Sequence, residues 1–123
     1  MPAKKVRPKV LVVDDERIIA DTLATILNQR GYEATAIYSG TDAVEHARNV
    51  KPDLVISDVI MPDMDGIEAA IRIRKFLPHC KILLFSGQAA TADLLESARA
   101  QGHEFEILAK PVHPQDLLAK LRR

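Results

Sequence analysis

The chain has 123 residues, which is the size of a single domain. Apolar residues make up 47% of it and 17 basic residues balance 17 acidic ones, so neither disorder nor strong attraction to nucleic acid is expected. The single cysteine, Cys80, excludes an internal disulfide and a multi-cysteine zinc site. No apolar run is long enough for a membrane span or a signal peptide, so we expect a cytoplasmic protein without membrane contact.

Charge is unevenly distributed along the chain. Basic residues gather at both ends, and residues 10–119 hold 17 acidic residues against 10 basic ones, a net charge of −7. We expect residues 1–8 to form a basic, solvated tail and residues 9–123 to form the folded domain. A weak contact of the basic ends with nucleic acid or another acidic partner is the lesser alternative, and direct nucleic-acid binding is not expected.

Five short apolar runs alternate with segments of helical periodicity. Most of the runs are apolar at every position, which is typical of strands buried on both faces of a parallel sheet. The runs are residues 10–13, 34–38, 54–56, 82–85 and 107–109.

Turn and capping residues bound the helical segments between these runs. Ser39 or Thr41 is expected to cap the second helix. Gly31 and Gly102 are expected to end the first and fourth helices, and Pro114 opens the fifth. Five alternating strand–helix units joined by right-handed crossovers predict one α/β domain, a doubly wound parallel sheet with helices on both faces.

In such a sheet ligands bind outside the carboxyl ends of the strands, so the polar residues found there are the candidates for a site. Those residues are Asp14 and Asp15 after the first run, Asp58 after the third, Ser86 after the fourth and Lys110 after the fifth. Three carboxylates in one cleft raise each other's pKa unless a cation lies among them. An all-oxygen site suits Mg²⁺, particularly beside a phosphoryl group that Lys110 and the Ser86 hydroxyl would contact. Asp58, on the central strand, is the best-placed covalent acceptor of phosphate.

These residues lie in four segments that together resemble the receiver domain of two-component response regulators. The segments are residues 12–16 (VVDDE), 53–66 (DLVISDVIMPDMDG), 84–87 (LFSG) and 108–111 (LAKP). Four motifs in order, each at the end of a predicted strand, are far more specific than any one of them. The resemblance implies a flavodoxin-like (βα)₅ domain with a five-stranded parallel sheet in the order 2-1-3-4-5.

The resemblance also implies the chemistry. A sensor histidine kinase, or a histidine phosphotransfer protein, would phosphorylate Asp58. Mg²⁺ would be held by Asp15 and Asp58, by the backbone carbonyl of Ile60, and by Asp14 at least through water. The domain would then be a regulatory switch that catalyses only its own phosphorylation and dephosphorylation, and no enzyme with a separate substrate.

Further residues are implied to carry the response. Ser86 would bind the phosphoryl group and move with it, Lys110 would pair with it, and the Lys110–Pro111 peptide is expected to be cis. The added charge would shift the face made by the fourth helix, fifth strand and fifth helix between two conformations. That face would act on an effector domain or a downstream protein, or form a phosphorylation-dependent homodimer.

One position departs from the pattern that is usual in this family. The family usually carries Tyr or Phe three residues before the lysine, where this chain has Ile107, so the usual coupling of hydroxyl to aromatic ring stays open. Phe105, on the same side of the strand, is a candidate replacement.

The resemblance also implies two positions that tune the lifetime of the phosphoryl group. Ile60 would exclude water and Gln88 could position it, so no lifetime is predicted.

Two rival functions remain open. A degenerate receiver acting by protein contact alone is supported by Ile107. A phosphohydrolase or transferase using an aspartyl phosphate would place Asp-x-Asp after the first strand, whereas Asp14 and Asp15 are adjacent. Asp63 and Asp65 are expected to be turn and cap residues rather than ligands. None of the histidines has the spacing of a metal site; they are His46, His79, His103 and His113.

Overall fold

The computed structural model describes residues 7–87 and 91–121. Within these residues five strands and five helices alternate along the chain, as the sequence predicts. In chain order they are β1 (Lys9–Val13), α1 (Arg17–Gln29), β2 (Glu33–Ile37), α2 (Gly40–Val50), β3 (Leu54–Asp58), α3 (Gly66–Phe76), β4 (Lys81–Ser86), α4 (Thr91–Ala100), β5 (Glu106–Ala109) and α5 (Pro114–Leu121).

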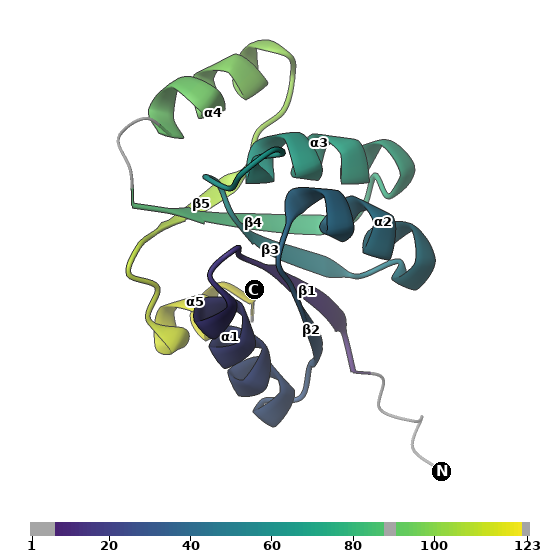
Figure 1. Cartoon of the computed structure of the whole chain (residues 1–123), viewed down its shortest axis with the longest axis vertical. Helices are drawn as coiled ribbons and strands as arrows, with labels where there is room; N and C mark the ends of the chain where they lie inside the picture. Colours follow the sequence, from purple (N-terminus) through teal and green to yellow (C-terminus); the bar gives the residue numbers. More distant parts are fainter. Residues whose placement is uncertain (1–6, 88–90, 122–123) are drawn as a thin grey trace.

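The strands form one parallel sheet in the order β2-β1-β3-β4-β5 (Figure 1). β3 is therefore the central strand, and every residue of it is buried. The edge strand β2 alternates between exposed and partly buried residues until Ile37. The predicted fold class and strand order are confirmed.

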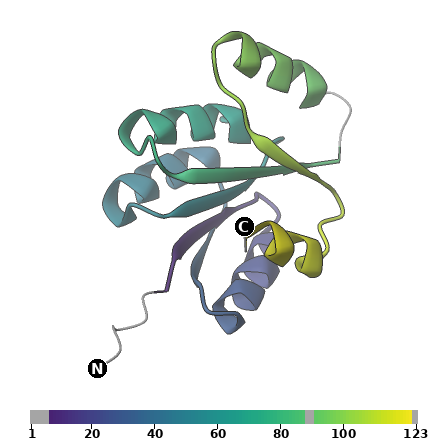
Figure 2. The same ribbon diagram turned by 180° about the vertical axis from the view of Figure 1, so that it is seen from behind.

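Helices cover both faces of the sheet (Figures 1 and 2). α2, α3 and α4 pack on one face, where Leu11 and Val13 of β1 point into the same cluster as Ile73 of α3. α1 and α5 pack on the other, where Val10 and Val12 meet the buried leucines of both helices. Because successive strand residues point to opposite faces, each strand contributes to both cores.

The caps explain where several helices begin and end. The Ser39 hydroxyl accepts a hydrogen bond from the N–H of Asp42 (3.1 Å), so Ser39 rather than Thr41 caps α2. The Asp65 carboxylate caps α3 by accepting from the N–H of Glu68 (2.8 Å). Gly102 follows α4 with a φ of +89°, a left-handed conformation that glycine adopts without strain. Asp63 has a φ of +67°, in keeping with its predicted place in a turn.

No helix in the described part of the chain is both long enough and apolar enough to cross a membrane.

Candidate functional site

The carboxyl ends of the strands meet at one edge of the sheet, where the polar residues predicted from the sequence surround a single pocket. Its volume is about 440 Å³. The lining residues are Asp15, Glu16, Asp58, Ile60, Ser86, Gly87 and Lys110. Five of these seven are site residues predicted from the sequence, and Asp14 lies buried beside them in the same carboxylate group. Parallel strand register is what brings residues so far apart in sequence together.

The end of β1 presents two neighbouring carboxylates in opposite environments. Asp14 is fully buried and Asp15 is exposed. The Oδ1 atom of Asp14 accepts a hydrogen bond from the N–H of Glu16 (2.9 Å), which is ordinary turn chemistry. Its Oδ2 atom is buried without a hydrogen-bond partner. Turn formation therefore explains one oxygen of Asp14 and leaves the other unsatisfied.

Asp58 is held at the end of β3 by a close approach of α3. The N–H of Gly66 donates to the carbonyl of Val59 (2.8 Å), and a Cβ atom at position 66 would lie 2.0 Å from the carbonyl oxygen of Asp58. Only glycine fits at that distance. The loop of residues 59–65 thus brings the start of α3 back against the end of β3, and Asp58 stays 6% exposed at the site.

Lys110 supplies a positive charge from the far side of the pocket. Its Nζ atom donates a hydrogen bond to Oδ2 of Asp58 (3.1 Å) and lies 3.8 Å from Oδ2 of Asp14. Its backbone N–H donates to the carbonyl of Ser86 (3.1 Å), which ties the end of β5 to the end of β4. The Lys110–Pro111 peptide bond is cis.

Burial dominates the electrostatics of the carboxylates. It raises the pKa of Asp14 to about 6; the Glu16 N–H opposes this shift and the charge of Asp58 adds to it. Burial also raises the pKa of Asp58, although the hydrogen bond and charge of Lys110 pull that pKa down. For Lys110 burial lowers the pKa, but the hydrogen bond and charge of Asp58 outweigh burial and leave it raised. One ammonium group thus faces three carboxylates.

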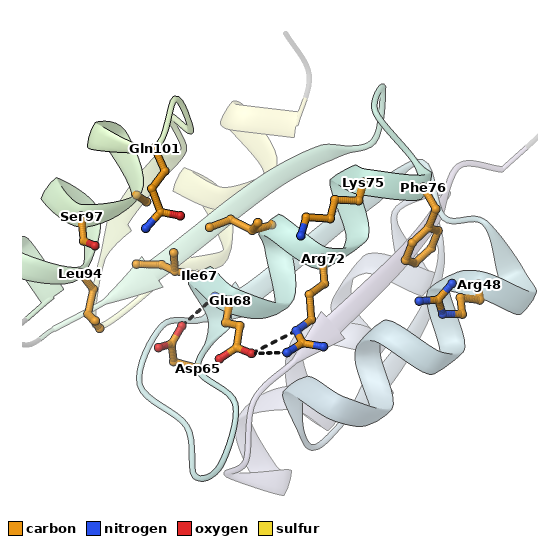
Figure 3. Close-up of a pocket in the computed structure, with 12 residues that line it drawn as sticks. Arg48, Asp65, Ile67, Glu68, Arg72, Lys75, Phe76, Leu94, Ser97 and Gln101 are labelled. Atoms are coloured by element: carbon orange, nitrogen blue, oxygen red, sulfur yellow. Dashed lines mark hydrogen bonds and ion pairs between the residues drawn. The ribbon is translucent and has the colours of Figure 1, made fainter.

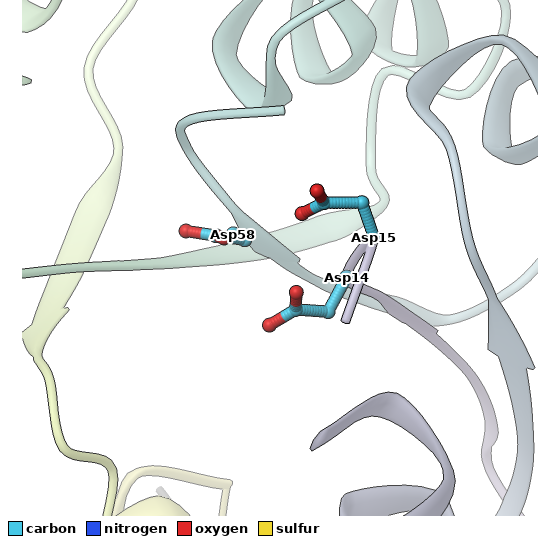
Figure 4. A group of neighbouring side chains, drawn as sticks. All are labelled: Asp14, Asp15 and Asp58. Atoms are coloured by element: carbon cyan, nitrogen blue, oxygen red, sulfur yellow. The ribbon is translucent and has the colours of Figure 1, made fainter. Parts of the chain in front are cut away.

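The carboxylates form a suitable cradle for a hard divalent cation. An oxygen from each of Asp14, Asp15 and Asp58 lies within 4.8 Å of the others, and among the described residues this is the one such group of three or more metal-binding side chains. Figure 4 shows the Asp14 and Asp15 side chains extending from the end of β1 toward Asp58. The Oδ2 atom of Asp14, which has no hydrogen-bond partner and lies 3.8 Å from the Lys110 ammonium, is the atom that a cation would satisfy. These residues therefore fit an oxygen-binding cation such as Mg²⁺.

Thr91 was not predicted from the sequence. It is the first residue of α4 and is 4% exposed, and its hydroxyl lies 2.5 Å from the hydroxyl of Ser86. Threonine at a helix start is common, so the sequence held no signal for this contact. The contact links the polar end of β4 to the following helix.

The other predicted positions are distributed more widely. Ile60 lines the pocket, whereas Gln88 lies outside the described residues. Ile107 is partly buried against the core under α2, α3 and α4. Phe105 precedes β5, at the opposite end of that strand from Ser86, and the Arg74 guanidinium lies over its ring at 4.7 Å. The structure therefore does not bring Phe105 to the site.

Taken together, a 2-1-3-4-5 sheet with an acidic trio, a hydroxyl and a lysine at its carboxyl edge defines the receiver class of signalling domains. The family model for the response regulator receiver domain matches residues 10–122, and the chain belongs to that family.

Individual relatives are similar to this chain over most of its length. The chain is 34% identical over 116 residues to the chemotaxis protein CheY of Thermotoga maritima, covering 94% of this chain and 95% of the relative. It is 32% identical over 113 residues to the probable transcriptional regulatory protein TcrX of Mycobacterium tuberculosis, covering 92% of this chain and 47% of TcrX. The chain spans about half the length of several curated relatives it matches. The crystal structure of Vibrio cholerae CheY4 superposes with a TM-score of 0.85 at 31% identity, covering 96% of this chain and 98% of that one.

Proposed function

We propose that this chain is a phospho-acceptor switch of a two-component phosphorelay, in which Asp58 receives the phosphoryl group. The donor is the phosphohistidine of a sensor histidine kinase or of a histidine phosphotransfer protein. The observation that carries the proposal is the contact of Asp58 with Lys110 in the pocket that Asp15 also lines, beside the buried Asp14. The proposed domain spans residues 9–123, preceded by a basic tail at residues 1–8.

The transfer is a substitution at phosphorus. A carboxylate oxygen of Asp58 attacks the phosphorus atom, a P–O bond forms, and the P–N bond to the donor imidazole breaks. The imidazole leaves with the bonding electron pair and takes up a proton from solvent. Water later attacks the aspartyl phosphate and releases inorganic phosphate, which restores Asp58. The domain therefore catalyses only its own phosphorylation and dephosphorylation.

Mg²⁺ is the cation we propose for this site. The carboxylates of Asp14, Asp15 and Asp58 would hold it, together with the backbone carbonyl of Ile60. When bound, the ion would neutralise charge on the phosphoryl oxygens. The fold itself keeps three carboxylates close together against their mutual repulsion, at the cost of an unpartnered Asp14 oxygen.

The remaining pocket residues have distinct proposed roles. Lys110 pairs with Asp58 before transfer and with a phosphoryl oxygen afterwards, because its Nζ atom already lies between Asp58 and Asp14. The Ser86 hydroxyl donates to another phosphoryl oxygen. Ile60 shields the phosphoryl group from water, and Gln88 positions water for hydrolysis, so the two oppose each other in setting its lifetime.

The output we propose is a shift of the face made by α4, β5 and α5. Phosphorylation adds up to two negative charges and three strong acceptors at the end of β3, which biases two conformations of the neighbouring elements. An effector domain, a downstream protein or a second phosphorylated copy would recognise the shifted face. Because Ile107 has no ring and no hydroxyl, this response cannot depend on an aromatic side chain at that position of β5.

A degenerate receiver that works by contact alone is the second candidate. Ile107 is the observation that favours it, since an aliphatic residue there removes one usual part of the switch. In that case the acidic trio and Lys110 would be structural remnants, and Asp58 would not accept a phosphoryl group.

Intact-mass measurement after incubation with acetyl phosphate, with and without Mg²⁺, separates the two. The switch predicts a Mg²⁺-dependent gain of one phosphoryl group in the wild type and none in Asp58→Asn. Asp63→Asn is the matched control, since it makes the same chemical change in the loop after β3, at a positive φ that asparagine tolerates. It should be phosphorylated like the wild type. No mass gain in a wild-type protein that binds Mg²⁺ would favour the degenerate receiver.

A further inference from the structure

The hydroxyl of Ser86, which has a role in the proposed phosphoryl transfer, contacts the hydroxyl of Thr91, which so far has none. Their oxygens lie 2.5 Å apart, and either one can be the donor. Ser86 is partly buried and lines the pocket at the carboxyl edge of the sheet, whereas Thr91 is buried in the first turn of α4. A buried hydroxyl that loses its hydrogen-bond partner costs free energy. The contact with Thr91 therefore favours the orientation in which the Ser86 hydroxyl points toward Thr91.

α4 is attached to the rest of the domain at few points. Of its ten residues, only Thr91 and Ala98 are buried. A pocket of about 750 Å³ lies between α4 and α3, with Leu94 and Ser97 on one side and Ile67 on the other (Figure 3). Thr91 is therefore the polar one of the two fully buried residues of the helix, which also packs on the core through the partly buried Leu94 and Leu95.

We propose that Thr91 is a positioning residue that holds the Ser86 hydroxyl in its resting orientation, so that phosphorylation of Asp58 and the placement of the first turn of α4 form one coupled equilibrium. This rests on the proposed function, because it requires Ser86 to contact the phosphoryl group. A hydroxyl has a single proton to donate. When Ser86 is the donor of this pair, its proton cannot also reach the phosphoryl group. A charged phosphoryl oxygen accepts a stronger hydrogen bond than a neutral hydroxyl does, so it competes with Thr91 for that proton and draws Ser86 away.

The consequence lies in α4. Once Ser86 turns to the phosphoryl group, the buried Thr91 hydroxyl is left without this partner, and the first turn of α4 has to shift to satisfy it. The helix is free to do so because the pocket beside it leaves room. Thr91 thereby resists the turning of Ser86 and converts that turning into movement of α4.

The experiment measures the affinity of Asp58 for beryllofluoride, a mimic of the phosphoryl group, by ¹⁹F NMR titration in Mg²⁺. Thr91→Val keeps the shape and removes the hydroxyl, so it should bind beryllofluoride about three- to tenfold more tightly than the wild type. Thr91→Ser restores the hydroxyl and should bind like the wild type. In a Ser86→Ala background Thr91→Val should have no effect, because Thr91 acts through Ser86.

Unaltered or weaker binding by Thr91→Val overturns the inference, and so does an equal effect in the Ser86→Ala background, which would show a packing role. Hydrogen exchange of residues 91–100 tests the coupling to α4. Beryllofluoride should change the exchange rates of these residues in the wild type and change them much less in Thr91→Val. An identical change in both overturns the coupling to α4. If the wild type neither binds beryllofluoride nor gains a phosphoryl group, the proposed function itself fails; binding without dependence on Thr91 removes only this inference.

Discussion

At the scale of single residues, the protonation of Asp14 links folding to pH. Asp14 is fully buried, one of its oxygens lacks a hydrogen-bond partner, and its pKa is raised to about 6. A raised carboxyl pKa means that the folded protein holds a proton at pH values where the unfolded chain has lost it. In the absence of a metal ion, Asp14 therefore favours folding at acidic pH and opposes it at neutral pH.

We expect this to appear in urea denaturation in metal-free buffer. The contribution of Asp14 to the free energy of unfolding is fully present below about pH 4 and is lost as pH rises through about 6, because the folded state binds more protons in that window. Asp14→Asn should remove this slope and be about 1–3 kcal/mol more stable than the wild type at pH 7. Equal slopes in the two proteins between pH 4 and pH 7 would contradict the assignment.

Cys80 gives a second prediction at this scale. The thiol is buried, and burial raises its pKa to about 11. At pH 8 almost none of it is thiolate, the reactive form. The native protein should react with a disulfide reagent such as DTNB at least tenfold more slowly than the urea-unfolded chain, which serves as the control because it has the same single thiol. Equal rates would mean that Cys80 is accessible in the folded state.

The sequence predicts five of the seven residues that line the pocket, but not how each is solvated. Asp14 and Asp15 are identical neighbours, and the alternation of a strand says that they differ in direction without saying which one is buried. The sequence also could not predict the contact between Ser86 and Thr91. That contact depends on where the first turn of α4 lies on the sheet, and packing over the whole face of the sheet sets this position.

At the scale of elements, the strand ends decide the geometry of the site. The apolar runs end at Ile56 and Phe85, yet β3 continues to Asp58 and β4 to Ser86. Asp58 pairs with Phe85 in the sheet register, so backbone pairing carries the polar residues two and one positions beyond the apolar run. Hydropathy cannot show this, because backbone hydrogen bonds do not depend on the polarity of the side chain. Asp58 and Ser86 are strand residues, which fixes them more firmly than loop residues.

The start of α3 beside Asp58 gives a prediction for an element boundary. Gly66→Ala places a methyl group into the carbonyl of Asp58, so α3 has to move away from the end of β3. We expect a loss of about 2–4 kcal/mol in the free energy of unfolding and reduced phosphorylation of Asp58 by acetyl phosphate.

Gly31→Ala is the control for this variant. It introduces strain at a φ of +95° with no atom within 4 Å of the new Cβ, and it lies far from the site in the chain. It should cost only about 1 kcal/mol and leave phosphorylation intact. Urea denaturation and intact mass measure both effects. If the two variants lose equal stability and both are phosphorylated normally, close packing at Gly66 does not position Asp58.

At the scale of the whole molecule, the proposed metal-binding group exists only in the folded chain. Its oxygens come from the ends of β1 and β3, which are about forty residues apart in sequence and are brought together by the sheet. A ligand that binds the folded state alone stabilises it in proportion to its saturation. Mg²⁺ binding and folding should therefore be linked.

The linkage can be measured by urea denaturation at constant ionic strength and increasing Mg²⁺. The free energy of unfolding should rise by about 2.7 kcal/mol when Mg²⁺ reaches a hundred times its Kd. Asp15→Asn removes an exposed carboxylate of the proposed metal site without disturbing the buried core, and it should abolish most of this rise. Asp63→Asn should keep the rise in full. A gain of the same size in Asp15→Asn would place the bound ion elsewhere on the protein.

The position of Lys110 links the charge balance of the site to the edge of the sheet. The ammonium that balances Asp58 follows directly after β5, the last strand and an edge of the sheet, while the acids lie at the ends of β1 and β3. β5 is held in the sheet by its pairing with β4, so the counter-charge of the acids depends on that strand pair. The charge balance at the site is therefore complete only when the edge strand is in place.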